Sequence, residues 1–256
     1  MAYTPPSLHF DGTLRSDTRR ADPVYARARP ARPMIAYDVA FLRSDGEVRA
    51  QRHRAPATPA FLGAFSAFAR GTLIATTRGP VAVEDLSPGM KLLTNERGPS
   101  PLLWIGAMTL MPEAQMFERG APALTRIMAD ALGLGRPVTD FIAGPSARIL
   151  QRDLGLGELL LQPVQDLVDG MQVIGLTPPS PVTLYHLGLH RHATITAAGL
   201  PVETYHPGPA FDAALPHEDV APFLALFPHV RQPSDFGSLA HPRLPLGGGS
   251  GRREPA

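Results

Sequence analysis

Short runs of apolar and β-branched residues, each ended by a turn signal, dominate the middle of the chain. Between Ala67 and Gly106 these runs lie at residues 72–77, 81–83, 90–94 and 102–105. The residues that separate the runs are rich in Gly and Pro, which favour tight turns. Strands this short and this closely spaced are typical of a curled all-β fold. The pattern therefore predicts a mainly β domain.

Ahead of this region the pattern predicts a hairpin and a short helix. Residues 34–42 and 47–53 flank an Asp-Gly pair, which is a strong signal for a β-hairpin. A Thr-Pro pair then fits the N-cap and first residue of a helix. Across residues 60–69, four apolar side chains recur at helical spacing: Phe61, Leu62, Phe65 and Phe68. The predicted helix therefore runs through Ala67.

Beyond the central region the apolar runs are more widely spaced. Strands are predicted at residues 124–128, 171–176 and 182–189, the last leading into 192–197. One amphipathic helix is predicted at residues 219–227. These elements leave the chain predominantly β.

The composition supports a folded domain, since hydrophobic residues make up 44% and charged residues 18% of the 256 residues. The net charge is only +1, because 24 Lys and Arg nearly balance 23 Asp and Glu. Such a chain has no general attraction to nucleic acid or to an anionic membrane, and neither is predicted as a partner. With no cysteine, disulfides, thiolate metal sites and thiol nucleophiles are excluded.

The basic residues that do cluster lie near the N-terminus: Arg15, Arg19, Arg20, Arg27, Arg29 and Arg32. Set among Pro and Ala, they are typical of a solvated, flexible arm, and a patch for an acidic partner is the alternative. The first residues carry no signal-peptide pattern, and no apolar run approaches the roughly 18 residues that a bilayer requires. The default prediction is a cytoplasmic protein with an unidentified protein partner.

A longer motif begins at Gly71 and reads G-T-x-I-A-T-x-x-G-P-V-x-V-E-D-L-x-P-G, followed by Leu-Thr and then Trp-Ile-Gly. It closely resembles the opening of a bacterial Hint domain, the autoprocessing module of hedgehog proteins and inteins. In that family a catalytic cysteine stands four residues before the Gly-Thr pair. This chain has Ala67 at that position. The resemblance implies a Hint-like β fold.

Two later segments carry the same resemblance. The Hint pattern S-P-x-H-R is similar to the sequence from Gly144 to Arg148, but Ala147 replaces the histidine and Gly144 replaces the hydroxyl residue. The closing segment of a Hint domain resembles residues 185–208. Inteins carry a His-Asn pair close to where this chain has Glu203 and Thr204.

The resemblance sets the predicted domain organisation. Four parts are expected: a mobile Pro/Arg-rich arm (1–32), a hairpin with a short helix (33–66), a Hint-like β domain (67–208), and a C-terminal helix with a disordered tail (209–256).

The resemblance also implies a chemistry that this chain lacks. In active family members the thiol attacks the preceding peptide carbonyl, and the middle-segment histidine assists the departure of the amide. The methyl groups of Ala67 and Ala147 can neither attack nor transfer a proton, so no catalytic residue is assigned. We expect a retained fold, a lost autoprocessing activity and a scaffold or interaction role. Residual self-cleavage through Ser66 or Thr72 is the enzymatic alternative.

Histidines form a second candidate constellation. His186, His190 and His192 fall on one face of an alternating strand, and His206 follows after the next turn. Two or more of these rings could share one metal ion, which gives a second alternative function. We favour the simpler interpretation, in which they are polar residues on the outward face of the strand. No metal or other cofactor is therefore predicted.

Overall fold

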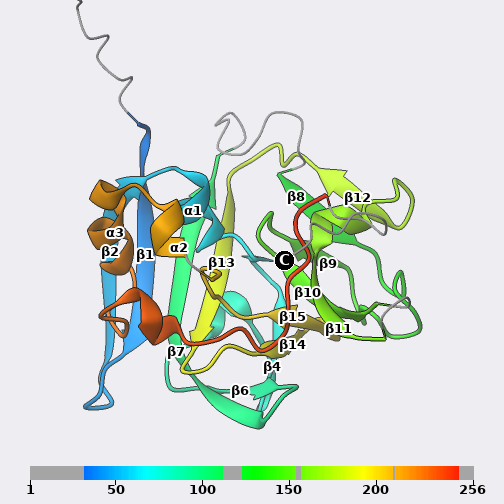
Figure 1. The fold of residues 1–256 in the computed structure, drawn as a ribbon. Helices are drawn as coiled ribbons and strands as arrows, with labels where there is room; N and C mark the ends of the chain where they lie inside the picture. The colour runs from blue at the N-terminus through cyan, green and yellow to red at the C-terminus, as the bar shows by residue number, and fades with distance from the viewer. Residues whose placement is uncertain (1–31, 112–122, 154–156, 210, 248–256) are drawn as a thin grey trace, which may run out of the picture. The chain divides into compact units, whose positions relative to one another are not determined.

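Strands make up most of the secondary structure in the computed structural model (Figure 1). The structure describes residues 32–111, 123–153, 157–209 and 211–247. Residues from Arg32 onward form one unit. The predicted N-terminal arm lies outside the described residues except for Arg32, as does the predicted tail beyond residue 247.

Within the described residues, the strands are β1 (Met34–Leu42), β2 (Val48–Pro56), β3 (Phe68–Ala69), β4 (Leu73–Thr76), β5 (Gly79–Ala82), β6 (Lys91–Thr94), β7 (Gly98–Leu110), β8 (Leu124–Ile127), β9 (Phe141–Ala143), β10 (Arg148–Arg152), β11 (Leu159–Pro163), β12 (Val173–Leu176), β13 (Val182–Leu189), β14 (Thr194–Ala197) and β15 (Leu200–Glu203). The α-helices are α1 (Pro59–Gly63), α2 (Phe211–Ala214) and α3 (His217–Leu224). The 3-10 helices are η1 (Val83–Asp85), η2 (Val164–Leu167) and η3 (Pro233–Phe236). The prediction of an all-β fold class is thereby confirmed.

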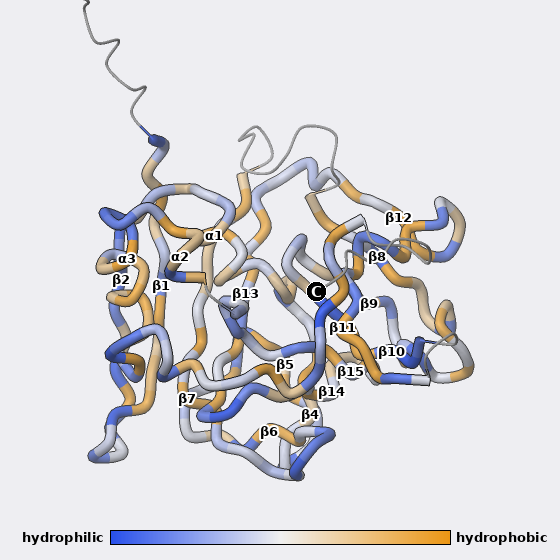
Figure 2. Tube along the Cα trace, viewed as in Figure 1, coloured by the Kyte–Doolittle hydropathy of each residue, from blue (hydrophilic) through white to orange (hydrophobic). Residues whose placement is uncertain are grey.

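The strands join into one sheet of 15 strands. Its main path runs β11-β10-β15-β14-β4-β6-β7-β13-β3-β9-β8-β12, while β1 pairs with β7, β2 with β1 and β5 with β4. The predicted hairpin is confirmed, since Leu42 pairs with Val48 across the turn and the strands run antiparallel. Hydrophobic positions recur along the strands, and many connecting turns are hydrophilic (Figure 2).

Strand β7 joins the two halves of the sheet. Its first residues pair with β6, and its later residues pair with β13 on one side and β1 on the other.

Gly106, within β7, lies where two aromatic rings leave no room for a side chain. A Cβ there would lie 2.3 Å from the Trp104 ring and 2.5 Å from the Phe65 ring. The bare backbone at Gly106 therefore lets two large rings pack against the strand.

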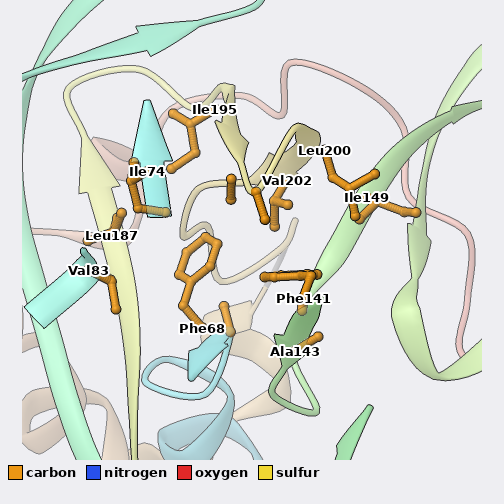
Figure 3. Packing of buried hydrophobic residues seen from close by; sticks show 14 of the residues in the cluster. Phe68, Ile74, Val83, Phe141, Ala143, Ile149, Leu187, Ile195, Leu200 and Val202 are labelled. Atoms are coloured by element: carbon orange, nitrogen blue, oxygen red, sulfur yellow. The ribbon is translucent and has the colours of Figure 1, made fainter. Parts of the chain in front are cut away.

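Two hydrophobic cores flank the sheet. The first lies between the strands of the family-like region and includes Phe68, Phe141 and Val202 (Figure 3). The second is aromatic and combines the N-terminal hairpin, α1 and the C-terminal helices around Trp104. The indole Nε1 of Trp104 donates a hydrogen bond to the carbonyl of Leu226 at 2.7 Å. Segments on both sides of the central region thus fold onto it.

The predicted helix over residues 60–69 is wrong in its second half. Helix α1 ends at Gly63, and Phe68–Ala69 form strand β3 instead. Phe68 pairs with Tyr185 on one side and Ala143 on the other. Tertiary strand pairing therefore overrides the local helical spacing, and Ala67 lies in a bend directly before β3 rather than in a helix.

Candidate functional site

Ala67 and Ala147 come together in the first core. The backbone N–H of Gly144 donates to the carbonyl of Ala67 at 2.9 Å, and that of Ser146 donates to the carbonyl of Ser66 at 3.0 Å. Both alanine side chains are buried in the same cluster. The two positions that the family resemblance marks for chemistry are therefore neighbours in the fold, and each presents only a methyl group.

Gly144 explains why these segments approach so closely. A Cβ at Gly144 would lie 2.1 Å from the carbonyl oxygen of Ser66, a distance that no side chain could accept. Gly144, which stands where the family has a hydroxyl residue, thus lies directly against the backbone of Ser66 and Ala67. Main-chain hydrogen bonds hold the two segments together, and the alanine side chains contribute only methyl groups.

The two substitute hydroxyls are engaged elsewhere. Ser66 is fully buried, and its Oγ donates to Ser146 Oγ at 3.2 Å. Thr72 Oγ1 donates to the carbonyl of Ala69 at 2.7 Å. In the hydrogen bonds of the described residues, these hydroxyls meet a second hydroxyl and a backbone carbonyl, neither of which is a general base at neutral pH.

The histidines do not form an outward face, so that part of the sequence interpretation is wrong. His186, His192 and His206 are buried, and only His190 is exposed, in the turn after β13. His186 packs edge-on against the rings of Phe68 and Tyr205, with ring centroids 5.9 and 5.2 Å away. Burial lowers its pKa to about 3. His186 is therefore a neutral core residue at neutral pH.

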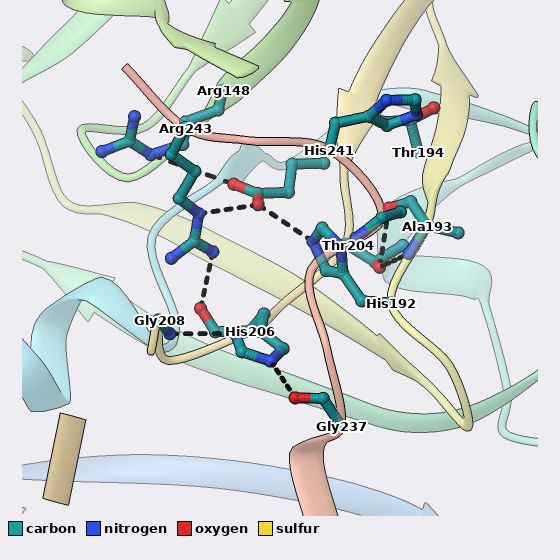
Figure 4. A network of polar contacts seen from close by, with 12 residues as sticks. Arg148, His192, Ala193, Thr194, Thr204, His206, Gly208, Gly237, His241 and Arg243 are labelled. Carbon is teal, nitrogen blue, oxygen red and sulfur yellow. Dashed lines mark hydrogen bonds and ion pairs between the residues drawn. The ribbon is translucent and has the colours of Figure 1, made fainter. Parts of the chain in front are cut away.

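A polar network surrounds Glu203, which is buried at the end of β15 (Figure 4). Arg243 Nε donates to Glu203 Oε1 at 2.8 Å, and His192 Nε2 lies 2.9 Å from the same oxygen. Arg148 Nε lies 3.9 Å from Oε2. Burial alone would raise the pKa of Glu203, but its contacts with His192 and Arg243 outweigh burial and hold the pKa below its usual range. Glu203 is thus a buried carboxylate.

Backbone groups fix the protons of the two histidines in this network. Ala240 N–H donates to His192 Nδ1 at 2.9 Å, so the ring proton of His192 lies on Nε2 and faces Glu203. Gly208 N–H donates to His206 Nδ1, while His206 Nε2 donates to the carbonyl of Gly237 at 3.1 Å. Burial lowers the pKa of His206 to about 4. The His206 ring therefore serves as a neutral hydrogen-bonding group.

The predicted histidine cluster is only partly assembled. His192 and His206 meet with ring centroids 5.3 Å apart, whereas His190 is exposed and His186 lies among aromatic rings. Across residues 32–247, apart from the gaps named above, no three His, Asp or Glu side chains are placed to hold a metal ion. The metal alternative therefore gains no geometric support from the described residues.

Thr204 and Arg243 also bind backbone carbonyls beside the Glu203 network. Thr204 is fully buried, and its Oγ1 donates to the carbonyl of Ala193 at 2.9 Å. Arg243 also donates to the carbonyl of His206 at 2.7 Å. Sequence reasoning did not assign Arg243, because it lies 40 residues beyond Glu203 in a segment without periodicity. No local signal could have identified it.

Comparison with known families covers the region of the paired alanines. The Hint domain model matches residues 66–209. The chain belongs to the Hint domain family. Solved structures similar to this chain include an intein-like domain from Clostridium thermocellum, with 14% identity, 55% of this chain and 99% of that chain covered, and a TM-score of 0.36. A DnaB intein from Synechocystis sp. PCC 6803 has 15% identity, the same two coverages and a TM-score of 0.35.

No curated protein matches the chain. Both alanines, the Glu203 network up to His206, and strands β3 to β15 lie within the matched span of the Hint domain. The N-terminal hairpin, helices α2 and α3, and Arg243 lie outside it. Among the described residues, none of the helices has the length and apolar character needed to cross a membrane.

Proposed function

We propose that the Hint domain of this chain has lost autoprocessing and serves as a scaffold for the segments fused to its two ends. The observation that carries this proposal is the pair of buried methyl groups at Ala67 and Ala147. A processing reaction needs a nucleophile and a proton donor at one peptide bond, and methyl groups supply neither.

The peptide bond itself is still presented in a favourable way. The carbonyl that a residue at position 67 would attack is that of Ser66, whose oxygen accepts the Ser146 N–H at 3.0 Å. A donor at this position would stabilise charge that develops on the oxygen. The site thus retains a polarising donor while it lacks the attacking group, which is the pattern expected of a lost activity on a retained scaffold.

The residues ahead of Ala67 are integrated into the fold. Strand β1 pairs with β7 from Tyr37 to Phe41, and Phe61 and Phe65 are fully buried in the aromatic core. In a processing domain this segment would be the part released by cleavage. Here its release would expose a large apolar surface, so the arrangement favours a permanent union of hairpin and Hint domain.

The test is intact mass spectrometry of the protein tagged at both ends, measured after denaturation. Denaturation is essential, because β1 would hold a cleaved fragment in place by its pairing with β7. We expect one species of full length. Two fragments that divide between Ser66 and Ala67 would contradict the proposal. Fragments that divide between Phe65 and Ser66, and that vanish in Ser66→Ala, would establish self-cleavage by the substitute hydroxyl, because that hydroxyl would attack the preceding carbonyl.

The scaffold role requires that a fused segment recruits a partner. Arg32 is tied to helix α3, with its Nη1 atom 2.5 Å from Asp219 and its Nη2 atom 3.3 Å from Glu218. A truncation should therefore remove residues 1–31 and keep Arg32. Affinity capture should then lose at least one specific partner relative to the full chain. Identical partners for both proteins would count against recruitment by the arm.

A further inference from the structure

Strand β2 leaves one long edge of the sheet without a partner strand. Within the described residues it pairs with β1 alone, along all nine of its residues. Residues 48–52 and Arg54 are exposed, so this stretch of the edge is open to solvent. A long, exposed strand edge offers unpaired backbone N–H and C=O groups to another chain.

The hydrogen bonds at the two ends of the hairpin show which backbone groups of β2 face outward. Arg43 N–H donates to the Glu47 carbonyl at 2.9 Å, and Ala57 N–H donates to the Pro33 carbonyl at 2.8 Å. Because hydrogen-bonded pairs alternate along an antiparallel ladder, the odd-numbered residues of β2 point their backbone groups at β1. Residues 48, 50, 52 and 54 therefore point theirs away from β1. In the part of the chain that the structure describes, no backbone group pairs with them.

The other ends of the sheet are covered or short. Strand β11 ends the main path, but Leu161 donates its N–H to the Pro242 carbonyl at 2.9 Å and accepts the Leu244 N–H at 3.0 Å. Strands β5 and β12 have four residues each, and β5 includes Pro80, which has no N–H to donate. Among the described strands, β2 thus presents the longest open edge.

The side chains of β2 favour an acidic partner. The strand carries three arginines, Arg49, Arg52 and Arg54, and no carboxylate. Arg49 pairs with Glu47 and Arg52 with Asp38, whereas Arg54 has no ion pair among the described residues. A second copy of this strand would place three further arginines beside these, and like charges on adjacent strands are destabilising. An acidic strand would instead meet opposite charges.

We propose that the open edge of β2 binds an extended acidic segment of another protein by β-strand addition. The outward backbone groups pair with those of the added segment, and its carboxylates lie beside the arginines of β2. Strand β2 precedes residues 66–209, which the Hint domain model matches, so the added strand extends the N-terminal hairpin. The inference rests on the scaffold role proposed above, for which it names a docking surface and a partner chemistry.

Short peptides that alternate Glu and Val test the proposal with the full-length protein. The probe is a fluorophore-labelled peptide of about eight residues, long enough to match the open edge, and binding is followed by fluorescence anisotropy. Saturable binding is expected. A peptide with Lys in place of every Glu should bind at least about tenfold more weakly, because it brings like charges together.

Backbone methylation of the same peptide separates strand addition from charge attraction alone. Two forms are compared, one N-methylated at every Glu and the other at every Val, with side-chain charge unchanged. Alternate residues direct their N–H groups to opposite edges of a strand, and an added strand uses one edge only. One methylated form should therefore lose binding while the other retains it.

Two variants of β2 locate the site. Ala50→Pro removes an outward N–H and leaves the pairing with β1 intact, since proline is tolerated where an edge N–H faces solvent; it should weaken the acidic peptide at least about fivefold. Arg54→Glu should weaken it at least about tenfold. Arg78→Glu, the same charge reversal in the exposed turn between β4 and β5, should leave binding unchanged.

The proposal is overturned if the acidic peptide does not saturate, if the Lys peptide binds equally well, or if both methylated forms bind alike. A concentration-dependent dimer that Ala50→Pro abolishes, measured by sedimentation, would assign the edge to a second copy and also overturn it. The peptide comparisons use the wild-type chain, so they decide the matter even if a variant fails to fold. A negative result would leave the intact-mass test unaffected, because that test reads cleavage and not docking.

Discussion

The paired alanines and the Glu203 network differ in what holds them together. Around Ala67 and Ala147, main-chain hydrogen bonds join two segments and the side chains are methyl groups. Around Glu203, a buried carboxylate is held by Arg243 and faced by His192. The positions that the family resemblance marks for chemistry hold buried methyl groups, whereas the buried Glu203 is tied by charged and polar contacts. This Hint domain thus has its fold with methyl groups at both of those positions.

The largest expected effect follows from breaking the structural tie. Arg243→Met should destabilise the protein by about 3 kcal/mol or more, because it leaves the buried charge of Glu203 without its closest cation. Urea unfolding measures the loss. Arg52→Met is the matched control, since the Arg52–Asp38 pair is exposed and is expected to contribute less than about 1 kcal/mol. Equal losses of unfolding free energy in the two variants would show that the contact between Arg243 and Glu203 does not stabilise the fold.

The contact between the paired segments is tested at Gly144. Gly144→Ala should cost about 2 kcal/mol, because its Cβ would lie 2.1 Å from a backbone oxygen that cannot move aside. Gly63→Ala at the end of α1 is the control, as nothing lies within 4 Å of its Cβ, and reduced unfolded-state entropy should stabilise it by about 0.5 kcal/mol. A neutral Gly144→Ala would show that the two segments are not tightly held.

The pH dependence of stability separates buried from exposed histidines. Burial lowers the pKa of His186 to about 3 and that of His206 to about 4. The unfolded chain therefore binds more protons between about pH 6.5 and 4, so the free energy of unfolding falls as the pH falls through this window. Each buried ring contributes up to about 1.4 kcal/mol per pH unit.

The measurement is urea unfolding at several pH values in three proteins. His186→Leu should have a shallower pH slope than the wild type, because it removes one buried ring that the unfolded chain protonates. His217→Leu, at an exposed position on α3, should keep the wild-type slope. A stability that stays constant from neutral pH down to about pH 5 would mean that the histidines are not neutral core residues.

The smallest expected effect is a gain of cleavage activity. Ala67→Cys combined with Ala147→His restores the two groups that the family resemblance implies, beside the Ser66 carbonyl that already accepts the Ser146 N–H. Slow, partial cleavage after Ser66 on addition of a thiol is expected, read by intact mass after denaturation. Ala67→Cys alone is the control and should be cleaved less. A folded double variant without any cleavage would mean that the scaffold has lost more than two side chains.

The sequence predicted those features that depend on local pattern. Alternation and turn residues located the β1–β2 hairpin and most strands. The motif around Gly71 located Ala67 as an informative position, and the segment from Gly144 to Arg148 located Ala147. The helix through Ala67 was wrong because Phe68 pairs with Tyr185 and Ala143, which are distant in sequence. Alternation along β13 could not tell which face of the strand is covered.

The sequence did not predict which segment of the chain covers the histidines. Residues near Gly237 and Ala240 pack over His206 and His192 and convert an apparent outward face into a buried network. The link from Arg243 to Glu203 spans 40 residues, and no periodicity marks either partner. Long-range contacts of single side chains leave no trace in the local pattern, so Arg243 emerges only from the three-dimensional arrangement.

The most direct test of the proposed loss of autoprocessing is the intact mass of the wild-type chain, tagged at both ends and denatured after prolonged incubation with a thiol. The account predicts a single species of full length, because Ala67 and Ala147 present only methyl groups to the Ser66 carbonyl. Two complementary fragments that meet between Ser66 and Ala67 would contradict it.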